Sequence, residues 1–145
     1  MTEDHANQLR SLEPLVGTWR IEGSGTSGAV RYTWAEFGGW LVQHVDIVAD
    51  TQHTHGVEYI GYDRETDSIR SHFFGGSGEF LEYTYSLDGS VLTIYYGGAD
   101  SPAKFVGTFN DDFTRNSGSW SWPGGGYEST MVKDSDDDTG LAASE

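Results

Sequence analysis

The sequence contains no cysteine and few basic residues, and each of these features excludes particular kinds of site or partner. Without cysteine there are no disulfides, no thiolate nucleophiles and no thiolate zinc sites. The 145 residues carry 8 Lys plus Arg against 23 Asp plus Glu, which gives a formal net charge of −15. Basic residues supply most of the attraction to phosphate backbones and anionic membrane surfaces, so we expect neither nucleic acid nor membrane as a partner.

Long apolar runs are missing as well. No stretch approaches the roughly 20 apolar residues that span a bilayer. The N-terminal stretch MTEDHANQLRSLEPL has acidic residues and no apolar run, so it does not resemble a signal peptide. We therefore expect a soluble, cytoplasmic, acidic protein.

Proline is scarce, whereas glycine and aromatic residues are abundant. The chain has 3 Pro against 20 Gly, 5 Trp, 8 Tyr and 7 Phe. This composition is typical of an all-β chain with many tight turns. A chain of this length usually forms one domain and buries a sufficient core without metal or disulfide links.

Ten short segments with β character follow one another along the chain, separated by turns rich in Gly, Asp or Ser. They cover residues 16–23, 29–37, 40–49, 55–62, 68–74, 79–86, 90–96, 103–109, 114–122 and 127–133. No connection is long enough for a crossover helix, which favours antiparallel, up-and-down order. Closing such a sheet on itself removes its edges. The sequence therefore predicts an all-β fold, a ten-stranded antiparallel up-and-down β-barrel.

The two ends of the chain differ from this pattern. Residues 4–13 predict one short N-terminal helix that Pro14 ends, with Leu9 and Leu12 on the same face. Residues 134–145, DSDDDTGLAASE, combine like charges with small residues and predict a disordered acidic tail. We expect a single barrel domain over residues 1–133.

The start of the first strand resembles a known group of barrels. Gly17 and Trp19 form a Gly-x-Trp motif directly after the short helix, which is similar to the opening motif of the calycin group. That group includes lipocalins, fatty-acid-binding proteins and nitrobindin-like barrels. The resemblance implies that the glycine permits a tight start and that the tryptophan plugs the closed end of the barrel.

Further features favour the nitrobindin-like or bacterial lipocalin-like members of this group. Only Ser24–Gly28 connects the first two strands, where fatty-acid-binding proteins insert a helical lid. The chain also resembles a family of small bacterial lipocalin-like proteins of unknown function in three short stretches: residues 36–39 (EFGG), 61–63 (GYD) and 125–127 (GGY). Together these resemblances imply a barrel with the capacity to bind a ligand.

The histidines limit which cofactors we expect. Nitrobindin-type barrels carry haem through a histidine near the C-terminal strands, and this sequence has no histidine after His72. His53 and His55, with Glu58 three residues on, superficially resemble a cupin metal motif, but the later Pro-x-Gly and histidine element is absent. We expect a solvated loop at His53, no metal and no cofactor.

The strand alternation suggests which side chains line the interior. On the third strand two rows of side chains alternate, and we expect the more apolar row to face the core. It consists of Leu41, Gln43, Val45 and Ile47. Flat aromatic walls with hydroxyl and indole N–H groups are typical of a ligand pocket, although such rings can also simply fill a core. We predict as ligand-binding residues Tyr32, Trp34, Glu36, Tyr62, Arg70, Tyr83, Tyr85, Trp120 and Trp122.

Two of the polar residues suggest acid–base chemistry. If Glu58 and His72 face the interior from neighbouring strands, burial and proximity would couple their protonation and allow proton transfer. The alternative is a Glu–Arg or Glu–His pair that satisfies polar groups in the barrel, with Arg70 compensating Glu58 or Glu36. No Gly-x-Ser-x-Gly motif occurs, and the glycine clusters lie in hairpins with no following helix to bind phosphate.

The sequence thus predicts lipocalin-like binding of a small apolar or aromatic organic molecule in the barrel cavity. The alternative is a cofactor-free enzyme of the cyclase, isomerase or hydratase type, acting on a secondary metabolite with Glu58 and His72 as catalytic residues. The sequence leaves open whether the ligand is transformed, and it leaves open the oligomeric state, a homodimer included.

Overall fold

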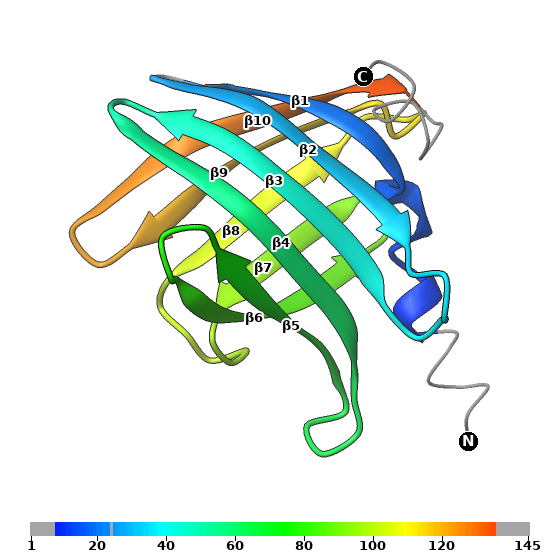
Figure 1. Cartoon of the computed structure of the whole chain (residues 1–145). Helices are drawn as coiled ribbons and strands as arrows, with labels where there is room; N and C mark the ends of the chain where they lie inside the picture. The colour runs from blue at the N-terminus through cyan, green and yellow to red at the C-terminus, as the bar shows by residue number, and fades with distance from the viewer. Residues whose placement is uncertain (1–7, 24, 136–145) are drawn as a thin grey trace.

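The chain forms a closed barrel of ten antiparallel strands. A computed structural model describes residues 8–23 and 25–135. Each strand pairs with the next along the chain, and the first pairs with the last (Figure 1). The strands are β1 (Gly17–Gly23), β2 (Thr26–Trp34), β3 (Leu41–Ala49), β4 (Gln52–Asp63), β5 (Ser68–Gly75), β6 (Phe80–Asp88), β7 (Val91–Tyr96), β8 (Lys104–Phe109), β9 (Arg115–Trp122) and β10 (Gly125–Ser135). The predicted fold class is confirmed.

The alternation of side chains explains how these strands close around a core. On β1, Trp19 and Ile21 are buried whereas Arg20 and Glu22 are exposed. Because successive side chains point to opposite faces, each strand contributes one row to the interior and one to the surface. The apolar row of β3, with Leu41 and Val45 buried, faces inward as expected.

Three strands begin two or three residues earlier than the sequence predicted. β2 covers Thr26–Trp34 instead of 29–37, and β4 begins at Gln52 instead of residue 55. β10 covers Gly125–Ser135, so residues 134 and 135, expected in the acidic tail, belong to the last strand. The rest of that tail, residues 136–145, lies outside the described residues.

One end of the barrel is closed by the N-terminal segment. Residues 8–10 are α-helical, and a 3₁₀ turn, η1 (Glu13–Leu15), follows with Pro14 inside it; residues 4–7 of the expected helix lie outside the described part. Leu9 and Leu12 are both buried, as their spacing predicted. Trp19 is fully buried below them, and its indole Nε1 donates a hydrogen bond to the carbonyl oxygen of Leu15 at 2.8 Å. This end is therefore filled by side chains.

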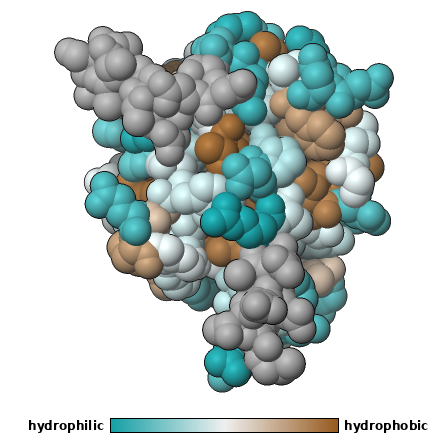
Figure 2. All heavy atoms as spheres, turned by 90° about the vertical axis from the view of Figure 1, so that its right-hand side faces the viewer, coloured by the Kyte–Doolittle hydropathy of each residue, from teal (hydrophilic) through white to brown (hydrophobic). Residues whose placement is uncertain are grey.

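The surface at the η1 end is mixed. Figure 2 shows hydrophobic side chains there in several separate groups among hydrophilic ones. Within residues 8–23 and 25–135, no helix has the length and apolar character needed to cross a membrane.

Candidate functional site

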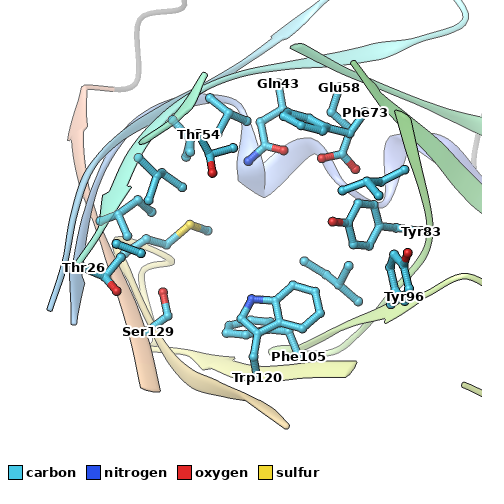
Figure 3. A pocket seen from close by; sticks show the side chains of 18 of the residues that line it. Thr26, Gln43, Thr54, Glu58, Phe73, Tyr83, Tyr96, Phe105, Trp120 and Ser129 are labelled. Carbon is cyan, nitrogen blue, oxygen red and sulfur yellow. The ribbon is translucent and has the colours of Figure 1, made fainter. Parts of the chain in front are cut away.

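A cavity of about 570 Å³ lies inside the barrel. Strands from around the whole ring contribute to its wall, and the labelled side chains point inward from all sides (Figure 3). Most lining side chains are apolar or aromatic. The polar exceptions are Thr26, Gln43, Gln52, Thr54, Glu58, Glu79, Asn116 and Ser129.

Glu58 on β4 is the buried carboxyl group of this cavity. It is only 5% exposed, and its Oε2 accepts hydrogen bonds from the hydroxyl groups of Ser71 and of Tyr85, the latter at 2.9 Å. Burial raises the pKa of Glu58 from 4.5 to about 7, although the two donated hydrogen bonds act in the opposite direction. The carboxyl group therefore changes its charge near neutral pH, which is the property of a proton carrier or of a switchable ion-pair partner.

Tyrosine hydroxyl groups surround this carboxyl group. Burial first, and then the negative charge of Glu58, raise the pKa of Tyr32, Tyr83 and Tyr85 above the ordinary tyrosine value. These hydroxyl groups consequently stay protonated and available as donors. Gln43, which faces Glu58 across the β3–β4 ladder, donates through Nε2 to the Tyr32 hydroxyl at 2.9 Å.

Asn116 on β9 is a second buried polar group in the wall. It is fully buried, and neither its Nδ2 nor its Oδ1 has a hydrogen-bond partner. In the ring of ten strands, β9 lies five places from β4 in either direction, so Asn116 and Glu58 belong to opposite walls. Figure 3 shows this relation through Trp120 of β9, which lies across the cavity from Glu58.

Aromatic rings line the wall between the two polar groups and the open end. Trp120 packs against Tyr83 and Phe105, with ring centroids 6.1 and 5.8 Å apart. Trp122 and Tyr127, from the β9–β10 hairpin, contact each other edge to face and are 43% and 45% exposed. They therefore lie at the rim, on the end of the barrel opposite η1, where the cavity reaches solvent.

The structure places six of the predicted site residues in the cavity wall. Five of them are aromatic, and the sixth is the carboxyl group. They are Tyr32, Glu58, Tyr83, Tyr85, Trp120 and Trp122.

Arg70 and His72 lie on the outer face of the barrel, so His72 does not face Glu58. Both approach Glu82 of β6, at 3.6 Å from the Arg70 Nη2 and 3.4 Å from the His72 Nε2. On β5 the inward row is Ile69, Ser71 and Phe73. Because neighbours along a strand point to opposite faces, the side chain that reaches Glu58 is Ser71, not His72.

Trp34, Glu36 and Tyr62 lie near the closed end, away from the cavity wall. The Trp34 Nε1 donates to the Glu13 carboxylate at 3.0 Å, which ties β2 to the N-terminal segment. Glu36 follows the end of β2 and is exposed in the loop to β3. Tyr62 donates its hydroxyl hydrogen to Asp67 in the β4–β5 turn. It lines, with Arg70 and His72, a hollow of about 280 Å³ outside the cavity.

His53, expected in a loop, lies in β4, and His55 lies in the same strand as expected. Both side chains are exposed, their rings stack at 5.8 Å, and the His53 Nε2 contacts the Asp46 carboxylate. Within the described part of the chain, no group of three or more His, Asp or Glu side chains is placed to hold a metal ion.

Sequence reasoning missed Gln43, Ser71 and Asn116 as site residues. The signal was available for two of them. Gln43 lies in the row of the third strand that we expected to face inward, and Asn116 lies an even number of residues from Trp120 and Trp122, both predicted to bind the ligand. A polar residue in an apolar row should therefore have been considered as a group that faces the cavity.

The fold and cavity together define a class, namely a small up-and-down antiparallel β-barrel with an internal cavity. This architecture fits a calycin-like barrel fold. No protein-family model matches the chain, and no curated protein sequence matches it.

Proposed function

We propose that this protein binds a small apolar or aromatic organic molecule inside its barrel, as lipocalin-like proteins do. The observation that carries the proposal is the cavity of about 570 Å³ lined mainly by apolar and aromatic side chains. Small-molecule pockets commonly have volumes of about 300–1,000 Å³ and combine apolar walls with a few polar groups. The interior is thus more than a packed core of its own side chains.

The cavity offers both affinity and orientation to such a ligand. Flat faces of Tyr83, Phe105 and Trp120 provide apolar contact area at low entropic cost. The carboxyl group of Glu58 and the amide of Asn116 fix the position of polar groups on the ligand, since they lie on opposite walls.

A pair of tryptophan variants on neighbouring residues tests this proposal. Ser129 lines the cavity from β10, whereas Glu128 is exposed on the outer face of the same strand. We expect the uncharged fluorescent probe N-phenyl-1-naphthylamine to bind the wild type, and Ser129→Trp to weaken binding by about ten-fold or more through loss of volume. Glu128→Trp should bind the probe as the wild type does. Equal binding by both variants would place the probe outside the barrel and contradict the proposal.

Native mass spectrometry of protein purified from its own host tests for the natural ligand. It should reveal a retained molecule of a size compatible with the cavity. The cytoplasmic location, the absence of nucleic-acid and membrane partners and the oligomeric state, a homodimer included, stay predictions from the sequence.

A second candidate function is a cofactor-free enzyme that uses Glu58 as an acid–base group. The observation in its favour is a buried carboxyl group that faces the cavity and has its pKa raised to about 7 by burial. Such a group transfers protons efficiently near neutral pH. Since His72 lies outside, Glu58 and the neighbouring tyrosine hydroxyl groups are the residues left for this role.

The reactive probe 5-nitrobenzisoxazole tests for this proton transfer. A base removes the ring C–H proton, the freed electron pair forms the nitrile, and the N–O bond breaks to give a phenolate. If Glu58 acts as a base, the rate should rise as pH increases through about 7, and Glu58→Gln should lower it by about 100-fold or more. An unchanged rate in this variant would exclude Glu58 as the base.

A further inference from the structure

The charges of the cavity wall are of one sign. Among the lining residues that the structure describes there are two carboxyl groups, Glu58 and Glu79, and no Lys, Arg or His. Arg70, one strand away from Glu58, points outward to Glu82. A ligand that carries a carboxylate or phosphate would therefore enter an apolar space without a basic partner, which is costly for a buried charge.

The wall also leaves the ionised form of Glu58 without a cation. The hydroxyl groups of Ser71 and Tyr85 both donate to one oxygen, Oε2. A carboxylate offers about four acceptor positions and, when buried, is stabilised chiefly by an opposite charge. Aromatic faces beside it, such as those of Phe73 and Tyr83, attract cations as well.

From these observations we infer that the ligand is a lipophilic cation, an apolar molecule with a protonated amine that pairs with Glu58. This inference rests on the proposed binding function and specifies its ligand class. The amine supplies the positive charge that the wall lacks, and the apolar body of the ligand contacts the rings between Glu58 and the rim. Asn116, whose buried amide has a free donor and acceptor, accommodates a second polar group of the ligand on the far wall.

The pH dependence of binding follows from the groups that face Glu58. From the strands packed around it these are Tyr32 on β2, Gln43 on β3, Ser71 and Phe73 on β5, and Tyr83 and Tyr85 on β6. The tyrosines have raised pKa values and stay neutral, so Glu58 is the group among these that ionises near neutrality. Amine binding should therefore strengthen as pH rises from about 6 to about 8, while the amine itself remains charged.

Three probes with the same aromatic body test the inference: 1-naphthylmethylamine, 1-naphthylmethanol and 1-naphthoate, measured by calorimetry at about pH 8. We expect the amine to bind about ten-fold or more tightly than the alcohol, and the carboxylate to bind about ten-fold or more weakly than the alcohol. In Glu58→Gln the preference for the amine over the alcohol should disappear.

Glu128→Gln is the matched control, because it removes the same charge from an exposed position on the outer face. It should keep the preference for the amine. The inference is overturned if the carboxylate binds as tightly as the amine, or if Glu58→Gln retains the preference. When the alcohol binds but the amine is not favoured, only the ligand class is wrong. When none of the three binds at about millimolar concentration, the binding function is wrong as well.

Discussion

Glu58 couples the stability of the barrel to pH. Its pKa is 4.5 as a free side chain and about 7 in the folded protein, because burial disfavours the charged form. Between these values the folded state holds a proton that the unfolded state has released, so the free energy of unfolding falls as pH rises through this window. The loss amounts to about 3 kcal/mol and persists above pH 7.

Glu58→Gln should remove this loss while keeping an oxygen acceptor for Ser71 and Tyr85. We expect the variant to exceed the wild type in unfolding free energy by up to about 3 kcal/mol at about pH 8, and by much less at about pH 5. Urea unfolding at the two pH values measures the difference. Glu128→Gln, on the outer face, should stay near the wild type at both; a Glu58→Gln effect that does not change with pH would refute the linkage.

Replacing Asn116 should have the opposite effect on the free energy of unfolding from replacing a hydrogen-bonded asparagine. The buried amide of Asn116 has no partner, so replacing it by the similarly shaped leucine removes two unsatisfied groups. Asn116→Leu should raise the free energy of unfolding by about 1 kcal/mol or more. Asn110→Leu should lower it by about 1 kcal/mol, since the Asn110 Oδ1 accepts from the Thr114 and Arg115 amides. Urea unfolding of the two variants gives the signs, and equal signs would contradict this account.

At the scale of elements, the number and order of the strands could be predicted from the sequence. Ten segments with β character, joined by short turns, are compatible with few sheet topologies. Residues 87–89 separate two of these segments, and Gly89 has there a positive φ of +63°, which favours glycine in a tight turn. The start of β2 was harder, because Ser24–Gly28 was interpreted as a turn. In the structure Gly28 pairs with Ile21 and Ile47 inside the sheet, so the strand starts and ends three residues earlier and leaves Glu36 in a loop.

The orientation of β5 shows why part of the site was missed. Phe73 and Phe74 are adjacent, so either row of this strand could have supplied the apolar face. The choice depends on the neighbours: Glu82 on β6 offers Arg70 and His72 an outer partner, and only pairing across strands reveals it. The alternation of polar and apolar residues within β5 alone therefore does not show which row faces the interior.

Gly28 is a position in the β2–β3 ladder where only glycine fits. Its φ is +142°, and a Cβ atom would lie 2.2 Å from the carbonyl oxygen of Asp46 and 2.7 Å from the Cα of Ile47. Gly28→Ala should therefore lower the free energy of unfolding by about 2 kcal/mol or more and speed amide exchange in β2 and β3. Gly98→Ala, whose Cβ atom would meet only the side chain of Asp100 at 3.3 Å, should change stability by less than about 0.5 kcal/mol. An effect of Gly28→Ala as small as that of Gly98→Ala would show that the ladder tolerates a side chain here.

At the scale of the whole molecule, charge and cavity act on a ligand at different stages. The net charge of −15 surrounds the barrel, and Asp50, Glu79 and Asp100 lie in or beside the hairpins of the open end. Such a field attracts cations over a distance and raises their association rate. The buried Glu58 acts later, because it is reached only inside the cavity, and so it governs how slowly a bound cation leaves.

These two roles separate in kinetics. Raising NaCl from about 0.02 M to about 0.5 M shortens the screening length from about 20 Å to about 4 Å. The association rate of 1-naphthylmethylamine should then fall by about ten-fold, while that of 1-naphthylmethanol should change little. Glu58→Gln should leave the salt dependence of association intact, because it removes only one of the many charges that attract the cation. It should speed dissociation of the amine, because Glu58 is the charge that the bound amine contacts. Stopped-flow fluorescence of the tryptophans measures both rates. If the same salt dependence appeared for the alcohol, electrostatic attraction of the cation would be ruled out as its cause.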